Sequence, residues 1–361
     1  MLKDILSLSE KFISIPSDPE NKKALSEILD FSLSQVSEFT IEKFEKNGVR
    51  SALIFNTEKR PSRFQILLNS HLDVIPGKPH QYIPKIKENR LYGVGAMDMK
   101  ANLACALLVF KKIAKSLHYP IALQLVTDEE VGGYNGTKYQ IQEHGVRSDF
   151  VITTEPTNLN IVHKAKGVLW IKISCTGKAA HGAYPWRGEN ALWKMQNFLN
   201  ILQKKYPIPH EETWQTTVNL SRIETQNKSF NKIPDNCEAW LDIRCIPEES
   251  QTIIYNIQSL LPEGFFSEIL FHENALLTEK RNLYLQNLQK IAQEITQKEI
   301  ILYGAHGTSD ARHFFDAGCN GIEFGPIGEG IGTDNEWVDI PSLEKYSHIL
   351  EAFLLSYNTK D

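Results

Sequence analysis

Four short segments in the first half of this chain carry acidic and histidine side chains of the kinds that bind divalent metals. They lie at residues 70–73, 95–100, 128–130 and 155–157. Imidazole and carboxylate groups are common protein ligands of zinc and related ions. Each segment alone is a weak signal, but their order and spacing together predict the ligand set of a two-metal hydrolase.

The first segment contains His71 and Asp73, which are two positions apart and therefore point to the same side of an extended chain. A metal-bound imidazole usually has its second nitrogen held by a carboxylate, which fixes its tautomer and basicity. Asp73 is a candidate for that role. The alternative is that the two residues only form a polar strand end.

Three further carboxylates stand at predicted element ends. Asp98 lies between a glycine-containing turn and a predicted helix, where it can bridge two ions or serve only as a helix N-cap. Glu129 and Glu130 are adjacent at a strand end, so they project in different directions. One can then bind metal while the other faces a water molecule as general base. The alternative is a solvated acidic turn.

Two later segments carry groups suited to substrate binding. His181 lies in a loop of small residues, which permits close approach of a ligand, although a plain surface histidine is the simpler interpretation. The glycine-rich segment 304–315 offers backbone amides together with Thr308, Ser309 and Arg312. These groups could hold a substrate carboxylate.

The hydrophobic pattern before residue 166 alternates strands with helices. Apolar strands are predicted over 51–55, 64–68, 120–126 and 150–153, and helices over 2–15, 24–36 and 98–117. This alternation indicates a largely parallel sheet covered by helices. Ligands of such sheets bind beyond the carboxyl ends of the strands, and the candidate metal ligands follow those ends.

The pattern changes near residue 166, where residues 168–175 alternate as a half-buried antiparallel strand does. Strands and two helices continue to residue 271, and the first pattern resumes near residue 280. We therefore predict an α/β fold with a mostly parallel sheet in a catalytic domain flanked by helices, at 1–165 and 276–361. A smaller α+β domain is inserted at 166–275.

Composition and charge narrow the class of protein. Hydrophobic residues make up 42% and charged residues 23%, which is ordinary for a globular protein. The net charge of −5 gives no reason to expect nucleic acid or an anionic membrane as partner. Neither an apolar signal region nor a run long enough to span a membrane is visible, so a cytoplasmic location is expected.

Taken together, the ordered segments resemble the metal-dependent amidohydrolases and exopeptidases that include succinyl-diaminopimelate desuccinylase, acetylornithine deacetylase and carboxypeptidase G2. The resemblance covers nearly the whole chain. It implies that His71, Asp98 and Glu155 hold one metal ion. It also implies that Asp98 and Glu130 hold a second ion. The metal is usually zinc, with cobalt or manganese possible.

The resemblance further assigns roles to other residues. Glu129 would be the general base and then the acid, and Asp73 would orient His71. The inserted domain in this family commonly forms a homodimer interface, from which His181 would stabilise the oxyanion at a neighbouring site. The residues of the same domain that would contact the substrate are Asn231 and Arg244.

One position departs from the family pattern. The family typically has His-x-x-Asn-Glu near its C-terminal end, and this histidine completes the second metal site. Here Gly332 occupies the histidine position, while Asn335 and Glu336 are present. Three explanations are open. Another group replaces the histidine, the enzyme works with one tightly held metal, or the chain binds a ligand without hydrolysing it. The candidate replacements are His306, His313 and Asp334.

The predicted function is zinc-dependent cleavage of the amide bond of an N-acyl amino acid, as in the biosynthetic deacylases. Arg244, Arg312 and Thr308 favour a substrate with a free carboxylate, either an N-acyl amino acid or a short peptide. An aminopeptidase or dipeptidase is the enzymatic alternative, and a non-catalytic ligand-binding relative is the other. The predicted partners are this small molecule and a second copy of the chain, with no nucleic acid and no membrane.

Overall fold

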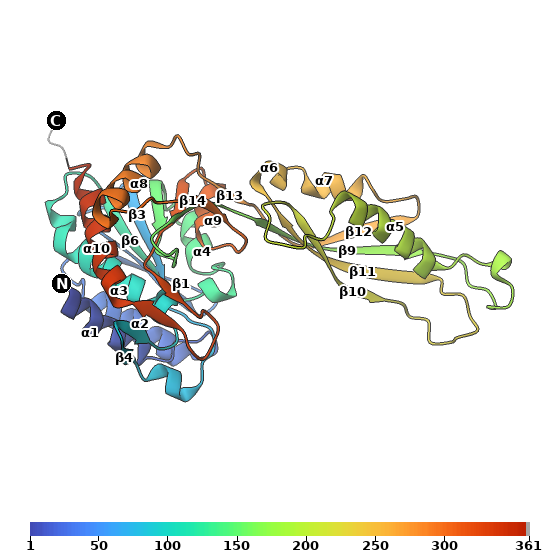
Figure 1. Ribbon diagram of the computed structural model, residues 1–361, viewed down its shortest axis with the longest axis horizontal. Coiled ribbons are helices and arrows are strands. Elements are labelled where there is room, and N and C mark those ends of the chain that lie inside the picture. The colour runs from blue at the N-terminus through green and yellow to red at the C-terminus, as the bar shows by residue number, and fades with distance from the viewer. Residues whose placement is uncertain (359–361) are drawn as a thin grey trace. The chain divides into compact units, whose positions relative to one another are not determined.

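The computed structural model describes residues 1–358, and the chain divides into two compact units. Unit 1 comprises Met1–His163, Leu277–Tyr303 and the residues from Ser309 onward, and unit 2 comprises Lys164–Leu276 with Gly304–Thr308. Figure 1 shows both units with their elements labelled. Within residues 1–358 the helices are all too short or too polar to cross a membrane.

Unit 1 is built on a mixed sheet whose centre is parallel. The strand order is β1 (Thr40–Lys46), β2 (Val49–Phe55), β6 (Ile121–Val126), β3 (Phe64–His71), β7 (Ser148–Thr153), β15 (Asn320–Glu323) and β8 (Ile161–Ala165). The strands β6, β3, β7 and β15 run parallel, and β1, β2 and β8 pair antiparallel beside them. The predicted mostly parallel sheet is confirmed. The short strands β13 (Leu276–Leu277) and β14 (Leu302–Ala305) lie beyond β15 next to β8.

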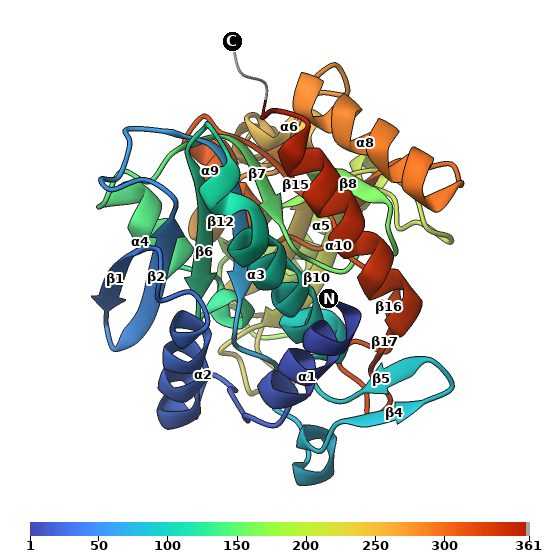
Figure 2. The same cartoon turned by 90° about the vertical axis from the view of Figure 1, so that its left-hand side faces the viewer.

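Alternate residues of the parallel strands face two separate hydrophobic cores, as the two-residue repeat of a strand requires. Ile66 and Leu68 of β3 pack into one core and Leu67 into the other. Helices therefore cover both faces, which explains why these strands are apolar throughout. The first core contains α1 (Leu2–Ile13), α2 (Lys22–Ser34), α3 (Ala101–Ile113), α8 (Leu283–Thr296) and α10 (Ile340–Leu355); the second contains α4 (Thr137–Gln142) and α9 (Ala311–Asp316). Figure 2 shows α3 next to both α1 and α10.

The helix predicted over 98–117 is shorter in the structure. It begins at Ala101 and ends at Ile113, and residues 96–100 form a tight irregular turn before it. Asp98 in this turn has φ −118° and ψ 92°, which are not helical angles. The interpretation of Asp98 as a simple N-cap of the helix is therefore wrong.

A small antiparallel sheet joins two distant parts of unit 1. Its order is β16 (Gly328–Glu329), β17 (Trp337–Asp339), β5 (Arg90–Tyr92) and β4 (Lys85–Lys87). Trp337 lies opposite Tyr92 in the β17–β5 pair. This pairing brings the segment that ends at Glu336 beside the turn that carries Asp98.

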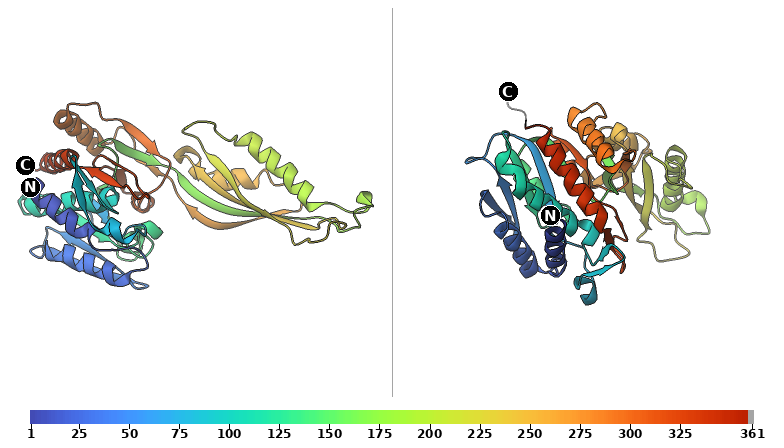
Figure 3. Two further views of the ribbon diagram at one scale, coloured as in Figure 1. Left: turned by 60° about the horizontal axis from the view of Figure 1, so that its bottom comes forward. Right: turned by 60° about the vertical axis from the view of Figure 1, so that its left-hand side comes forward.

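Unit 2 is an antiparallel sheet with helices on one face (Figure 3). The strand order is β10 (Thr217–Glu224), β11 (Asn236–Cys245), β9 (Gly167–Thr176) and β12 (Phe265–Glu273). Apolar residues of β9 and β11, such as Ile171 and Leu241, pack with α5 (Ala191–Lys205) and α7 (Ile253–Gln258). The short helix α6 covers Pro247–Ser250. The alternation predicted at 168–175 is realised in β9, whose buried side chains face these helices.

Candidate metal centre

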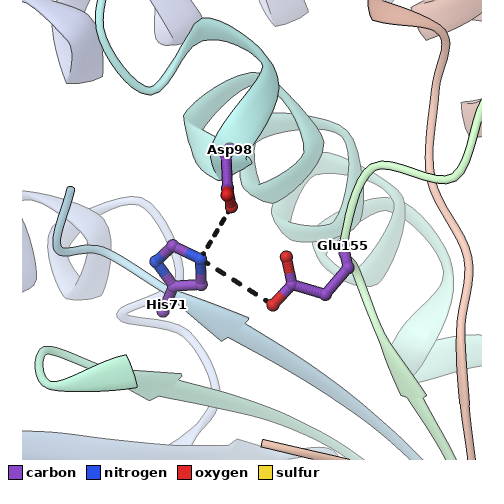
Figure 4. Close-up of side chains that lie close together, drawn as sticks. All are labelled: His71, Asp98 and Glu155. Atoms are coloured by element: carbon purple, nitrogen blue, oxygen red, sulfur yellow. Dashed lines mark hydrogen bonds and ion pairs between the residues drawn. The ribbon is translucent and has the colours of Figure 1, made fainter. Parts of the chain in front are cut away.

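Three of the predicted ligands converge in unit 1, and Figure 4 shows their side chains pointing toward one another. His71 ends β3, Glu155 follows β7, and Asp98 lies in the turn before α3. His71 Nε2 is 3.1 Å from Asp98 Oδ1 and 3.8 Å from Glu155 Oε1. The three ligand atoms lie within 4.8 Å of one another, and residues 1–358 contain this one group of that kind.

The chemistry of this group fits a divalent cation. One imidazole and two carboxylates are ligands that zinc, cobalt and manganese accept. Glu155 Oε1 is buried and has no hydrogen-bond partner in the described part of the chain. Burial, together with the negative charge of Asp98, raises the pKa of Glu155 well above its ordinary value. A cation among these groups would satisfy the buried oxygen and offset the repulsion between the carboxylates.

The imidazole of His71 is oriented by a hydrogen bond to residue 73. Its Nδ1 donates a hydrogen bond to the backbone carbonyl of Asp73 at 2.9 Å, which leaves Nε2 to face Asp98 and Glu155. Asp73 Oδ1 lies farther from Nδ1, at 3.6 Å. Asp73 Oδ2 accepts a hydrogen bond from the backbone N–H of Glu130 at 2.9 Å. Residue 73 therefore touches the ring mainly through its carbonyl, and orientation by its carboxylate stays a prediction.

Glu129 and Glu130 follow β6 in a short 3₁₀ turn, Glu129–Val131. Glu130 Oε1 accepts a hydrogen bond from the backbone N–H of Ile75 at 3.1 Å, and burial raises the pKa of Glu130 to about 7. Burial also raises the pKa of Glu129 well above its ordinary value, and the charge of Asp310 adds to this effect. A buried carboxyl with a raised pKa can hold a proton and pass it to a neighbouring group.

The turn that carries these two acids rests on helix α9. Arg312 Nη2 donates to the carbonyl of Gly132 at 2.8 Å, and His313 Nε2 lies 2.9 Å from the same oxygen. The backbone N–H of Gly132 in turn donates to the carbonyl of Glu129 at 2.7 Å. Arg312 is only 4% exposed and also donates to the carbonyl of Ser309 at 2.7 Å. The structure places Arg312 behind the Glu129 turn, and its contact with a substrate stays a prediction.

The side chains considered as replacements for the missing histidine each have another partner. Asp334 is exposed and forms an ion pair with Lys78. His306 belongs to unit 2, where its Nε2 is 3.2 Å from Glu212 Oε1. His313 is buried against the turn that follows β6. Replacement of the histidine by one of them would require that residue to leave its present partner.

The remaining predicted substrate residues lie in unit 2. His181 and Asn231 are exposed in loops. Arg244 Nε donates to Asp242 Oδ1 at 2.9 Å, so its guanidinium already has an acidic neighbour. Thr308 Oγ1 is buried and has no hydrogen-bond partner among residues 1–358. The roles of these four residues toward a substrate stay predictions.

Two buried glutamates of unit 1 were not singled out as site residues from the sequence. Glu336 lies against the turn that holds Asp98, and Glu323 ends β15 and accepts a hydrogen bond from Ser309 Oγ at 2.6 Å. Burial raises the pKa of each to about 7. Glu323 stands at the carboxyl end of the parallel strand β15, as His71 does at the end of β3, so its position relative to the sheet is the signal that could have identified it.

Comparisons with known proteins give matches along most of the chain. A model of peptidase family M20/M25/M40 matches residues 67–356, a range that includes all the predicted ligands. A probable carboxypeptidase of Emericella nidulans is 31% identical and the match covers 69% of this chain, which spans 65% of the length of that relative. A succinyl-diaminopimelate desuccinylase of Pelagibacter ubique is 26% identical with 98% of both chains covered.

A solved structure also matches over the whole length. The aminopeptidase PepT of Bacillus cereus superposes with a TM-score of 0.81 at 17% identity, and 99% of each chain is covered. At this identity the likeness establishes the fold alone. It agrees with the mixed α/β architecture described above.

Proposed function

This chain belongs to peptidase family M20/M25/M40, a family of hydrolases, and from that premise we propose that it cleaves an amide bond with the help of a bound metal ion. The observation that supports the proposal is the convergence of three side chains: His71 and Glu155, at the carboxyl ends of parallel strands, and Asp98, in the turn before α3. Glu129 lies within electrostatic range of the same group. A bare polar strand end would not bring these four residues together.

The residues divide the chemistry among them. His71, Asp98 and Glu155 would hold the ion, which we propose to be zinc. When bound, such an ion supplies Lewis acidity, which lowers the pKa of a water molecule from about 15.7 toward 7 and polarises a carbonyl. Glu129 would accept the proton of the attacking water and return it to the nitrogen of the leaving amine. The Asp73 carbonyl keeps the His71 ring directed into the centre.

We propose that one ion is held tightly and that the second position known in the family is weak. Gly332 has no side chain to coordinate metal, and Glu130 turns one carboxylate oxygen to the backbone of Ile75. The three candidate replacements for the histidine have the other partners described above. Retention of Glu129 beside the centre supports a catalytic site over a pure binding site.

The proposed substrate is an amide whose nitrogen belongs to an amino acid with a free carboxylate. Removal of a succinyl group from diaminopimelate and removal of the last residue of a peptide both fit this description. The desuccinylase match over 98% of the chain supports an N-acyl amino acid. The carboxypeptidase match at 31% identity supports a short peptide as the second candidate. Asn231, Arg244, Thr308 and Arg312 are the proposed substrate contacts.

A substrate panel tests this proposal. Zinc-loaded protein is expected to hydrolyse succinyl-diaminopimelate, acetylornithine or an N-acetylated dipeptide, and to lose activity when the free carboxylate is amidated. Activity only on the N-acetylated dipeptide would select the carboxypeptidase candidate. Activity that requires a free amine and tolerates C-terminal amidation would instead identify an aminopeptidase. Zinc binding without any turnover would favour a binding protein.

We also propose that the chain forms a homodimer through unit 2, in the cytoplasm. Large apolar side chains are exposed there, including Trp186, Trp193 and Phe230. If His181 acts on the site of a second copy, a mixture of Glu129→Ala and His181→Ala chains should recover activity that neither has alone. Verified heterodimers without recovery would contradict a shared site.

A further inference from the structure

The buried carboxylate of Glu336 contacts the turn that carries Asp98. Its Oε1 accepts hydrogen bonds from the backbone N–H groups of Met97, at 2.8 Å, and Asp98, at 3.0 Å. Its Oε2 accepts one from the N–H of Gly95 at 3.0 Å. Glu336 is only 3% exposed. Three hydrogen bonds from neighbouring backbone N–H groups to one buried side chain restrict the conformation of the turn, because losing any of them would leave a buried polar group without a partner.

The turn needs acceptors from outside because it is not helical. Asp98 and Met99 have φ/ψ values of −118°/92° and −132°/30°, so the N–H groups in this turn cannot form a continuous helical ladder. Gly95 starts the turn with φ +75°, and a Cβ there would lie 2.5 Å from Val74 Cγ1, so a side chain does not fit. Glu336 supplies the acceptors that a regular helix would have provided.

The backbone around Glu336 is itself fixed. The β17–β5 pairing begins at the next residue, and the N–H of Gly93 donates to the carbonyl of Glu336 at 3.2 Å. Lys100 is fully buried nearby, and its Nζ donates to the carbonyl of Ile15 at 2.7 Å. Burial lowers the pKa of Lys100 to about 7, and the neighbouring carboxylate of Glu336 acts in the opposite direction. The carboxylate therefore has a defined position from which to hold the turn.

We infer that Glu336 is a positioning residue of the metal centre: it holds the backbone of residues 95–98 so that the Asp98 carboxylate stays directed at His71 Nε2, 3.1 Å away. This role rests on the function proposed above. Its consequence is that the segment around Gly332 still serves the centre, through Glu336, although Gly332 itself brings no ligand. Support of this kind sets how well a metal ligand is oriented and hence the affinity for the ion.

Glu336→Gln tests the inference, because the amide NH₂ group would face an N–H donor and at least one of the three hydrogen bonds would be lost. Zinc affinity is measured with zinc alone, by competition with a chromophoric chelator. It is expected to fall about 10- to 100-fold, the range for residues that support metal ligands. The matched control is Glu329→Gln, an exposed glutamate in β16, which should bind zinc like the wild type. At saturating zinc, Glu336→Gln should lower kcat and leave KM nearly unchanged.

The outcomes separate this inference from the proposed function. A folded Glu336→Gln chain that binds zinc as tightly as the wild type overturns the inference and leaves the proposed function standing. A wild-type chain that binds no zinc overturns the proposed function. Should Glu336→Gln fail to fold, Glu336→Asp takes its place, since it keeps both oxygens but withdraws them by one methylene. The inference then requires weaker zinc binding, and equal binding contradicts it.

Discussion

In unit 1 the residues predicted to hold the first metal ion and those predicted for the second are positioned in different ways, and they are called the first and the second side of the candidate metal centre. On the first side His71 and Glu155 follow β3 and β7, which pair in parallel. The backbone N–H of Asp98 donates a hydrogen bond to Glu336. On the other side Glu130 bonds to the backbone of Ile75, and Gly332 stands in an exposed turn. Ligands at strand ends are fixed by the sheet itself, whereas a ligand on a loop can be lost without disturbing the core. We therefore propose that the first side alone defines the metal affinity of this chain.

The largest effect is expected from removal of the first side. His71→Ala deletes the one nitrogen ligand, so zinc affinity should fall by more than about 100-fold, beyond the loss typical of supporting residues. Amide hydrolysis should fall below detection with it. His348→Ala, an exposed histidine on α10, is the control and should change neither property. Unaltered zinc binding in folded His71→Ala would place the tight site elsewhere.

A second prediction separates chemistry from metal binding. Glu129→Gln keeps the size of the side chain but removes the proton acceptor, so kcat should fall about 10²- to 10⁴-fold while zinc affinity stays unchanged. Glu130→Gln changes a residue of the second side and should lower activity less than Glu129→Gln does. An equal loss of activity in Glu130→Gln, together with loss of a bound zinc equivalent, would show that the second side is functional.

A third prediction concerns the second side, where a histidine can be introduced at residue 332. Gly332→His restores the histidine of the family pattern, so it should add a second zinc equivalent. There is room for the Cβ, whose nearest neighbour would be Ile75 Cδ1 at 3.6 Å. Residue 332 has φ +75°, so a side chain there should cost about 1–2 kcal/mol of stability. Gly332→Ala carries the same backbone cost without a ligand and is the control. Equal zinc content in the two variants would contradict the proposal that the glycine weakens the second metal position.

The smallest effect is a pH dependence of stability without metal. Burial raises the pKa of Glu323 to about 7 from an ordinary value of 4.5. Between these values the folded state holds a proton that the unfolded state has released, so this group lowers stability as pH rises. Glu323→Gln should therefore gain stability relative to the wild type from pH 4.5 to 7, measured by thermal unfolding in chelator. A difference that does not vary with pH would refute this assignment.

The parts that could be predicted from sequence are those in which local pattern and tertiary structure agree. The parallel strands are apolar on both faces, so their ends, and with them His71 and Glu155, could be located. The strand β1 (Thr40–Lys46) was missed because it is half-exposed and carries charged residues that mask its alternation. Asp98 was placed at a helix start because acidic residues favour that position.

The support from Glu336 could not be predicted, for a physical reason. Its partners are backbone N–H groups, which nearly every residue type has, so the sequence does not reveal them. Gly95, one of these partners, also lies 241 positions away in the sequence. The same limit applies to Arg312. Its residue type suggests a carboxylate partner, yet two of its hydrogen bonds go to the backbone carbonyls of Ser309 and Gly132.

The central claim is that one tightly bound metal ion, held by His71, Asp98 and Glu155, suffices for amide hydrolysis. The most direct test is a zinc titration of metal-free protein in which bound zinc per chain and turnover of an N-acyl amino acid are followed together. The account predicts that activity rises with the first equivalent and is complete when one zinc is bound per chain. Activity that appears only with the second equivalent would contradict it.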